Sequence, residues 1–361
     1  MPGGDRPVLR SVAAKGVGCL WRPHTRVCVR GDGAGWVLSR EAQSLQGVAK
    51  SLGLGVLSAR WAPFLHRQCV FSTDQFALLN DRYFTAENRY AVSYFHGRPG
   101  QGVAEFDRCH AQLKRFKNHI WRVHVSHRAM ERVVCESGIA PERVRRIPIA
   151  VDCDLFASSH WKRDTLRQSL GIPESAVVIG SFQKDGVGWG DGLEPKLIKG
   201  PDILVRVLAR LRARLPELFV LLSGPARGYV RRELDKAGVP YRHLDLPSYE
   251  AVAGLYRALD LYLVTSREEG GPKAVLESMA SGVPLISTRV GQATELVEHG
   301  RNGWLVDVGD EDALVAQAEW VLGHPAEVEP VKTAGRATAA QNTYAAQRPL
   351  WREFFAGFVE P

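Results

Sequence analysis

Apolar residues along this chain fall in short continuous runs, which alternate with longer stretches where apolar positions recur every three or four residues. Short apolar runs are typical of strands buried on both faces, and the wider spacing is typical of helices. Strands are predicted at 26–30, 68–71, 90–95, 122–125, 176–180, 218–223, 259–265 and 283–287. Helices are predicted at 36–52, 103–117, 128–137, 201–215, 249–258, 311–322 and, beyond a polar stretch after Pro325, at 341–358. This alternation predicts parallel sheets covered by helices on both faces.

The alternation is interrupted by a mixed, polar stretch at 153–174, which divides the chain into two parts. A length of 361 residues with 45% apolar content suits two hydrophobic cores. The predicted organisation is an N-terminal Rossmann-like domain at 1–152, a linker at 153–174 and a second domain at 175–330. The last helix, 341–358, is expected to pack back on the first domain. The fold class is therefore α/β, with two Rossmann-like doubly wound domains facing each other across a cleft.

Cysteine usage and hydropathy bear on the compartment. No run approaches the ~18 apolar residues that span a bilayer, and residues 1–30 are Arg-rich without the apolar core of a signal peptide. The six cysteines never form a C-x-x-C pair, which argues against a zinc site and a disulfide framework. A cytoplasmic location is expected.

Charge is shared unevenly between the two halves. Residues 1–150 carry 23 Lys and Arg against 11 Asp and Glu, whereas residues 151–361 carry 24 against 28. A basic first half predicts an anionic partner, such as a phosphorylated acceptor, an acidic membrane surface or nucleic acid, unless it only reflects a generally basic, Arg-rich proteome. The stretch at 114–122 mixes cations with Phe116 and Trp121, which suits a peripheral membrane contact or an ordinary solvated helix face.

The strongest candidate for chemistry is Glu269-Gly-Gly-Pro-Lys-Ala-Val-Leu-Glu277, directly after the predicted strand at 259–265. Pro272 suits the first turn of a helix, and Gly282 suits the position just past its end. Gly270 and Gly271 leave backbone N–H groups uncovered at the positive end of that helix, where a diphosphate binds readily. At ~1.5 Å per residue, Glu277 lies roughly 7–8 Å along the helix. The two acids therefore bracket a diphosphate, as the sugar and the ribose of a nucleotide-sugar do.

This segment resembles the E-x7-E signature of retaining family 4 glycosyltransferases, which have the GT-B fold. The resemblance continues through 278–287, 291–297 and 300–306, and residues 125–130 and 146–156 resemble the domain junction of that family. Ile149-Ala150 stands where the family usually has Asn-Gly. The resemblance implies a hexosyltransferase of glycan biosynthesis that moves a sugar from a nucleoside diphosphate to an acceptor hydroxyl, without a metal or another cofactor.

Residue roles follow from the same resemblance. Glu269 would hold the transferred sugar and Glu277 the ribose, while Lys199 and Lys184 would hold the phosphates. Lys184 stands where an Arg is usual, and a lysine is a point charge without the bidentate fork of arginine. The implied donor-binding residues are Glu277, Lys184, Lys199, Gly270, Gly271, Pro272, Lys273, Ala274, Val275 and Gly224. The implied catalytic residues are Glu269, His96 and Lys199, with His96 approaching the donor sugar from the first domain.

Two further motifs bear on the chemistry of the chain. The loop with Gly31, Gly33 and Gly35 resembles the glycine loop after the first strand of GT-B proteins, whereas it lacks the spacing of a dinucleotide fingerprint. Asp152 and Asp154 form an Asp-x-Asp pair after an apolar run, as in metal-dependent transferases. They fall in the domain junction, far in sequence from Glu269, and no metal site is expected.

Two alternatives remain at this point. If it is not a glycosyltransferase, the chain is either another GT-B enzyme, such as a sugar-nucleotide epimerase or a phosphorylase, or a GT-B binding module without catalysis. The expected partners are a nucleoside diphosphate sugar and an anionic or lipid-linked acceptor, with no nucleic acid. Contact with the cytoplasmic face of a membrane is one option for the acceptor side.

Overall fold

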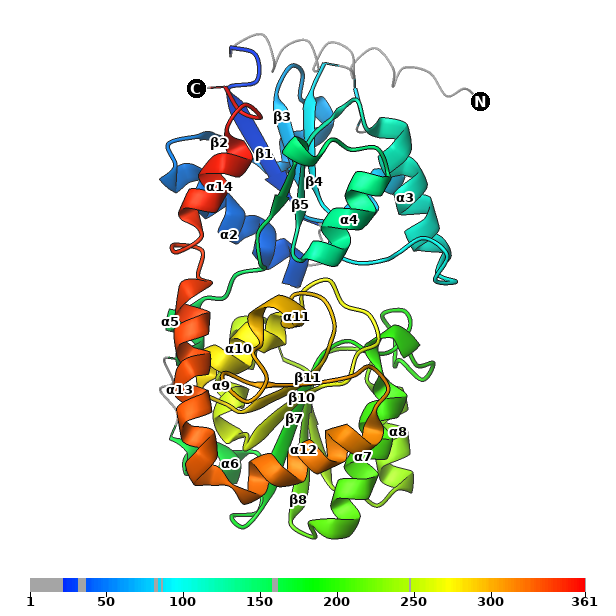
Figure 1. The fold of residues 1–361 in the computed structure, drawn as a ribbon, viewed down its shortest axis with the longest axis vertical. Coiled ribbons are helices and arrows are strands. Elements are labelled where there is room, and N and C mark those ends of the chain that lie inside the picture. Colours follow the sequence, from blue (N-terminus) through cyan, green and yellow to red (C-terminus); the bar gives the residue numbers. More distant parts are fainter. Residues whose placement is uncertain are drawn as a thin grey trace, which may run out of the picture. The chain divides into compact units, whose positions relative to one another are not determined.

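The computed structural model describes residues 22–31, 37–80, 84–85, 87–157, 162–246 and 248–360. Contacts divide the chain into two units, each with its own sheet (Figure 1). Unit 1 comprises Met1–Pro148 together with Tyr344–Pro361, and unit 2 comprises Ile149–Thr343. Within the described ranges, no helix has the length and apolar content needed to cross a membrane.

Unit 1 is built on a six-stranded sheet with the order β2-β1-β3-β4-β5-β6, in which every neighbouring pair is parallel. The strands are β1 (Arg26–Arg30), β2 (Gly55–Leu57), β3 (Cys69–Ser72), β4 (Arg89–Ser93), β5 (Ile120–Val125) and β6 (Val144–Arg146). The α-helices are α2 (Val37–Ser51), α3 (Ala104–Phe116), α4 (Arg128–Glu136) and α14 (Arg348–Phe355), and the short 3₁₀ segments are η1 (Ala59–Phe64), η2 (Gln75–Leu79) and η4 (Pro141–Arg143).

The C-terminal helix α14 completes the core of unit 1. Its side chains Trp351, Phe354 and Phe355 are buried against β1, β3 and α2. The ring of Phe354 lies 4.8 Å from that of Phe71 on β3. Aromatic side chains of this size contribute much of the apolar area that a small core buries. Unit 1 is therefore assembled from both ends of the chain.

Unit 2 has a second six-stranded parallel sheet, with the order β12-β11-β10-β7-β8-β9. Its strands are β7 (Val177–Phe182), β8 (Leu218–Ser223), β9 (Tyr241–Leu244), β10 (Leu261–Val264), β11 (Leu285–Thr288) and β12 (Trp304–Val306). Its helices are α5 (Cys153–Ala157), α6 (Arg163–Ser169), η5 (Leu197–Lys199), α7 (Pro201–Arg214), α8 (Gly228–Lys236), α9 (Glu250–Leu255), η6 (Tyr256–Ala258), α10 (Lys273–Ser281), α11 (Ala293–Leu296), α12 (Glu311–Gly323) and α13 (Pro325–Gln341). Counted from β7, the strand order is 3-2-1-4-5-6, the order of dinucleotide-binding folds.

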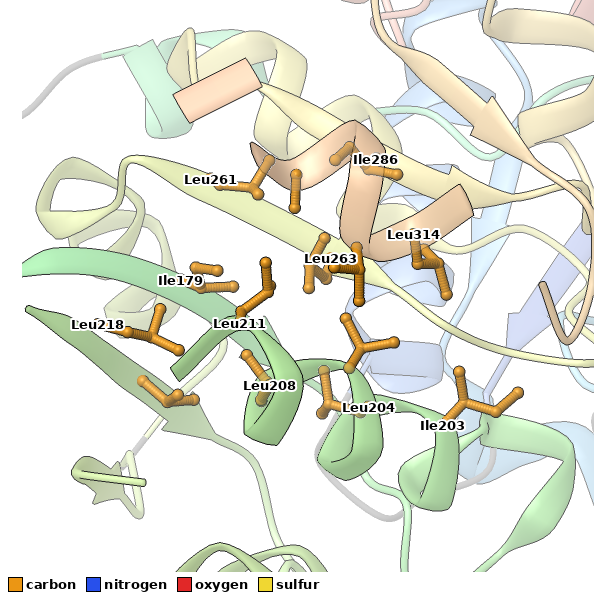
Figure 2. Packing of buried hydrophobic residues seen from close by; sticks show 14 of the residues in the cluster. Ile179, Ile203, Leu204, Leu208, Leu211, Leu218, Leu261, Leu263, Ile286 and Leu314 are labelled. Carbon is orange, nitrogen blue, oxygen red and sulfur yellow. The ribbon is translucent and has the colours of Figure 1, made fainter. Parts of the chain in front are cut away.

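The core of unit 2 explains why its helices and strands can be predicted from the apolar pattern of the sequence. Helix α7 turns Leu204, Leu208 and Leu211 toward the sheet, at the spacing of one helix face (Figure 2). They pack against strand residues such as Ile179 and Leu263, which are themselves almost fully buried. The strands carry apolar residues in succession because helices cover both faces of a parallel sheet. These findings confirm the predicted α/β class with two Rossmann-like units.

Two parts of the predicted organisation differ in the structure. The predicted linker at 153–174 contains α5 and α6, and its contacts place it in unit 2. Arg167 of α6 is buried and donates to the carbonyl of Ala258 from Nε at 3.0 Å and to the carboxylate of Asp260 from Nη2 at 2.6 Å. The polar character of this stretch arises mainly from exposed residues such as Lys162 and Asp164, while the buried Arg167 pairs with residues just before β10.

The second difference concerns the C-terminus. The polar stretch after Pro325 forms α13, and the last helix begins at Arg348 rather than at 341. Helix α13 buries small and β-branched residues, Val328, Val331, Gly335 and Ala339, against α10 and its neighbours. Small side chains let two helices approach closely but produce little apolar signal in the sequence.

Candidate active site

The candidate site lies at the carboxyl ends of β7 and β10, where the strand order of unit 2 reverses direction. Ligands of open α/β sheets bind at this switch point. The loop after β10 lies directly against the segment that leads from β7 into α7. Gly200 in that segment has φ +64°, and a Cβ there would lie 1.9 Å from the carbonyl oxygen of Thr265. The hydroxyl of Thr265 donates to the Gly200 carbonyl at 3.0 Å. Glycine at position 200 therefore allows the two loops to meet.

Glu269 and Lys199 form an ion pair across these two loops. Their carboxylate and ammonium groups are 2.6 Å apart, and the Glu269 side chain is only 10% exposed. The second carboxylate oxygen accepts a hydrogen bond from Ser266 Oγ at 2.9 Å. A buried charge needs both a counter-ion and hydrogen bonds to be tolerated, and Glu269 has both.

Glu277 is held separately, on the first turns of α10. Tyr249 donates its hydroxyl hydrogen to Oε1, and Tyr256 donates to Oε2 at 3.0 Å. Burial raises the pKa of Glu277, while the hydrogen bond from Tyr249 and the charge of Lys273 oppose this shift. The carboxylate keeps acceptor capacity beyond its two tyrosines, because its two oxygens offer about four lone-pair sites.

The glycine turn between the two acids is shaped by residues from elsewhere in unit 2. A Cβ at Gly271 would lie 2.5 Å from Cδ1 of Ile149, so this glycine leaves the space that Ile149 fills. Gln292 fixes both sides of the contact: its Oε1 accepts from the Ile149 N–H at 2.7 Å, and its own N–H donates to the Gly270 carbonyl at 3.2 Å. Ile149 thus packs against the turn.

Helix α10 begins one residue later than predicted. Pro272 precedes it in an extended conformation (ψ 104°), and Lys273 is the first helical residue. Gly282 ends the helix in the left-handed region (φ +67°), which confirms the predicted stop. The helical segment that includes Ala274 and Val275 thus starts at the candidate site.

Lys184 lies in the segment after β7, near Lys199. Its ammonium donates to the Gly186 carbonyl at 3.0 Å and lies 5.0 Å from the centroid of the Trp189 ring. Burial lowers the pKa of Lys184, and the charge of Lys199 lowers it further. Two cations that repel each other in this way favour an anion between them.

Gly224 lies at the end of β8, beside the same segment. It has φ +108°, and a Cβ there would lie 2.6 Å from the carbonyl oxygen of Gln183. Its own carbonyl accepts a hydrogen bond from His243 Nε2 at 2.8 Å. The structure therefore gathers Gly224, Lys184, Lys199, Glu269 and Glu277 within one unit.

The remaining predicted residues lie elsewhere. His96 follows β4 in unit 1, where its carbonyl accepts from Gln75 Nε2 at 2.7 Å and its ring lies 5.3 Å from that of Phe106. Its approach to a donor sugar stays a prediction. Gly31 lies at the end of β1, whereas Gly33 and Gly35 fall outside the described residues. Asp152 accepts a hydrogen bond from the Leu155 N–H at 3.1 Å, which caps α5.

Sequence reasoning missed the residues that hold the two acids. Tyr249 and Tyr256 are seven residues apart on the predicted helix at 249–258, so the helical period alone places them on one face. Ser266 is three residues before Glu269 in the same loop. No local signal identifies Gln292, because its contacts to Ile149 and Gly270 depend on the tertiary fold.

Comparison with known proteins agrees with this geometry. Residues 192–324 match the model of the glycosyl transferases group 1 family. The chain is 29% identical over 210 residues to the D-inositol 3-phosphate glycosyltransferase of Corynebacterium jeikeium. The aligned region covers 51% of this chain and 48% of that protein. It is also 29% identical over 216 residues to the GDP-mannose-dependent α-(1-6)-phosphatidylinositol monomannoside mannosyltransferase of Mycolicibacterium smegmatis, covering 55% and 52% of the two chains. The chain thus spans about half the length of these curated relatives.

Solved structures resemble the whole fold. Anabaena HepE in complex with UDP-glucose superposes with a TM-score of 0.74 at 19% identity, covering 92% of this chain and 100% of that one. A glycosyltransferase from Rickettsia africae superposes with a TM-score of 0.71 at 14% identity, covering 94% and 100%. At such identities the likeness concerns the fold. The chain therefore has the GT-B fold, and residues 192–324 of its second unit are similar to the domain of the group 1 glycosyl transferases.

Proposed function

We propose that this protein is a retaining glycosyltransferase that moves a sugar from a nucleoside diphosphate to an acceptor hydroxyl without a metal ion. The observation that carries the proposal is the pair formed by Glu269 and Lys199 at the switch point of unit 2, with a 2.6 Å contact between the two loops. Glu277, held by Tyr249 and Tyr256 on the adjacent helix, supplies a second acid. Two fixed acids, one of them paired with a cation, match a ligand that has hydroxyls at both ends and phosphates between.

The charges of the site suit the bond that breaks. When the bond between the anomeric carbon and the phosphate oxygen opens, negative charge develops on the departing diphosphate. In this proposal Lys199 and Lys184 lie beside the diphosphate, and preorganised positive charges of this kind stabilise a transition state. They supply the stabilisation for which many transferases use Mg²⁺.

Retention follows in this proposal from the roles of the remaining groups. Glu269 accepts hydrogen bonds from hydroxyls of the transferred sugar and stays a positioning group, so no covalent sugar–enzyme bond forms. The acceptor oxygen attacks from the face that the diphosphate leaves. Its proton passes to the departing phosphate oxygen, so that one C–O bond breaks, one forms and the proton is accounted for.

One relative is named as GDP-mannose-dependent, and one structural neighbour is a complex with UDP-glucose. GDP-mannose and UDP-glucose are therefore the first donors to test. A thermal-shift panel with UDP-, GDP-, ADP- and dTDP-sugars identifies the donor, because a ligand at ~100 times its Kd adds ~2.7 kcal/mol of stability. Turnover of that donor with candidate acceptors is then followed with and without EDTA. The anomeric configuration of the product, read by NMR, tests retention.

Variants separate the two acids. Glu269→Ala is expected to lower kcat by about 10²–10³-fold, the usual loss for a group that acts in the transition state, while donor binding partly survives. Glu277→Ala is expected to weaken donor binding mainly. Normal turnover by Glu269→Ala would contradict the proposal. Inactivity in EDTA that Mg²⁺ restores would contradict the metal-free mechanism only.

Other GT-B activities are distinguished by their products. Donor alone yields an epimerised sugar nucleotide if the protein is an epimerase. A sugar phosphate that forms only when inorganic phosphate is added indicates a phosphorylase. Donor binding without any product, over a broad range of acceptors, indicates a binding module.

A further inference from the structure

A glycine-rich insertion, residues 185–195, separates the two lysines of the candidate site. It forms a hairpin in which Gly186 pairs with Pro195 in an antiparallel bridge. The Val187 N–H donates to the Glu194 carbonyl at 2.9 Å, and the Lys196 N–H donates to the Asp185 carbonyl at 2.8 Å. In Figure 1 this green segment projects beyond the sheet of unit 2, next to the start of α7.

The hairpin is fixed to the rest of unit 2 by a buried ion pair. The side chains of Asp185 and Arg227 are both fully buried, with Nε of Arg227 3.0 Å from Oδ1 of Asp185. Arg227 also donates to the carbonyls of Ser181, Gln183 and Ser223 at 2.8–3.1 Å. One arginine thus ties the hairpin to the ends of β7 and β8.

Backbone contacts add to this anchoring. A Cβ at Gly186 or Gly192 would lie 2.3 or 2.1 Å from the carbonyl oxygen of Ala226, so the hairpin lies directly on that peptide. The first N–H groups of α8, from Gly228 and Tyr229, donate to the carbonyls of Asp191 and Gly192 at 2.7 and 2.8 Å. The hairpin therefore caps α8 and is held at several points.

Trp189 sits on this anchored hairpin with its side chain largely in solvent. It is 65% exposed, the most exposed large hydrophobic residue among those that the structure describes. Its neighbours Gly188 and Gly190 have no atom within 4 Å of a Cβ position, so nothing packs beside it there. The Lys184 ammonium nevertheless lies over its ring at 5.0 Å. An exposed indole on a fixed hairpin, directed at a cation of the candidate site, requires an explanation beyond folding.

We propose that Trp189 is a positioning residue for Lys184, and that the insertion holds this lysine ready to bind the diphosphate of the donor. The inference rests on the proposed function. Lysine has a long flexible side chain and lacks the rigid fork of arginine. The hairpin restrains it from two sides, through the Gly186 carbonyl at 3.0 Å and through the indole ring, which is the strongest aromatic partner of a cation. A restrained ammonium loses less freedom when the diphosphate binds.

The test compares binding of a diphosphate and a monophosphate by calorimetry. The probes are UDP and UMP, or the guanosine or adenosine pair if the wild-type protein selects that base. Trp189→Ala is expected to weaken diphosphate binding about 5-fold, the order expected for one partly exposed cation–π contact, and to leave monophosphate binding unchanged. Trp189→Phe keeps an aromatic face and is expected to recover most of the loss.

A double-mutant cycle shows whether Trp189 acts through Lys184. If it does, Trp189→Ala has no further effect on a protein that already carries Lys184→Ala. Trp320→Ala removes another partly exposed tryptophan of the same unit and serves as the control, with no change for either nucleotide.

Three results would overturn the inference: unchanged diphosphate binding by Trp189→Ala, equal losses for diphosphate and monophosphate, or additive effects in the cycle. Each of them leaves the proposed function intact. Failure of the wild-type protein to bind any nucleoside diphosphate would instead refute the proposed function and this role together.

Discussion

The two units share one architecture but bury different kinds of polar groups. Each has six parallel strands, yet unit 1 buries mainly neutral side chains such as His124, Gln75 and Asn88. When histidine is counted as neutral, Glu41 is the only buried charged side chain among the described residues of unit 1. Unit 2 buries Arg167, Asp185, Arg227, Glu269 and Glu277.

This difference indicates where the molecule accepts an energetic cost. A buried ion pair is weak evidence for stability, because desolvation offsets much of its attraction. Most buried charges of unit 2 gather around the carboxyl ends of β7, β8 and β10, either in the candidate site or in the anchor of its hairpin. Unit 1 is instead stabilised by an aromatic core in which α14 takes part. Unit 2 is therefore the part expected to trade stability for function.

The largest expected effect concerns the core of unit 1. Phe354→Ala removes a fully buried ring that packs on Phe71 and should lower the free energy of unfolding by about 3–5 kcal/mol. Leu350→Ala, on the same helix but 40% exposed, is the matched control and should change it little. Hydrogen exchange followed peptide by peptide should place the loss in unit 1. A loss confined to unit 2 would break the comparison.

In unit 2 the corresponding change removes a charge. Arg227→Met leaves Asp185 buried without its partner and should cost roughly 3–4 kcal/mol. The loss stays near the lower end of the usual range because burial already raises the pKa of Asp185, so that this carboxyl takes up a proton readily. Denaturant unfolding measures the effect, and the double variant Asp185→Asn/Arg227→Met should recover part of it. A single variant as stable as wild type would show that the ion pair does not anchor the hairpin.

Acid should weaken unit 1 through His124. Its ring accepts from Ser93 and donates to the Ile147 carbonyl, and burial lowers its pKa to about 4. Between pH 6.5 and 4 the unfolded state binds a proton at this histidine and the folded state does not. The free energy of unfolding therefore falls as pH falls, by up to about 3 kcal/mol. His124→Gln keeps both hydrogen-bond functions without titrating. The pH dependence of unfolding should therefore be shallower in this variant, and equal slopes would contradict the account.

The smallest expected stability effect has the opposite sign. Burial raises the pKa of Glu277 above its ordinary value of 4.5. As pH rises from 4.5 toward the pKa of the folded state, the unfolded state loses a proton that the folded state retains. Stability therefore falls with rising pH, and neutral Glu277→Gln should be at least as stable as wild type at pH 7. Its affinity for the nucleotide should nevertheless drop tenfold or more, since a charge-assisted pair of hydrogen bonds is lost. Thermal unfolding and calorimetry on the same samples measure both. A destabilised variant with unchanged affinity would show that Glu277 is structural.

How far the fold follows from the sequence depends on the position of each strand. The predicted strands, such as 26–30 and 218–223, all lie inside the sheets, where burial on both faces requires a continuous apolar run. The strands that the pattern does not predict, β2, β6, β9 and β12, are the four edges of the two sheets. They have three or four residues each, and β6 reads Val-Arg-Arg. A short edge strand with one open side needs little apolar sequence.

The candidate site divides in a similar way. Glu269 and Glu277 are predicted because they belong to one continuous motif, and Lys199 is predicted from the family resemblance. Tyr256 and Gln292 are not, because each reaches the site from a different element. The insertion at 185–195 carries no motif that predicts its structure. Its hairpin, its anchor at Arg227 and the contact between Trp189 and Lys184 depend on the fold.

By itself, the sequence determined the order of buried strands and covering helices, the strand–turn–helix around Glu269 and the helix stop at Gly282. These features depend on local periodicity and on backbone preferences that neighbouring residues impose. Only the tertiary structure decided that 153–174 belongs to unit 2, that the last helix begins at Arg348, and which side chains stabilise the buried acids. Such contacts join residues far apart in the chain, and their free energy arises from burial and electrostatics in the assembled unit.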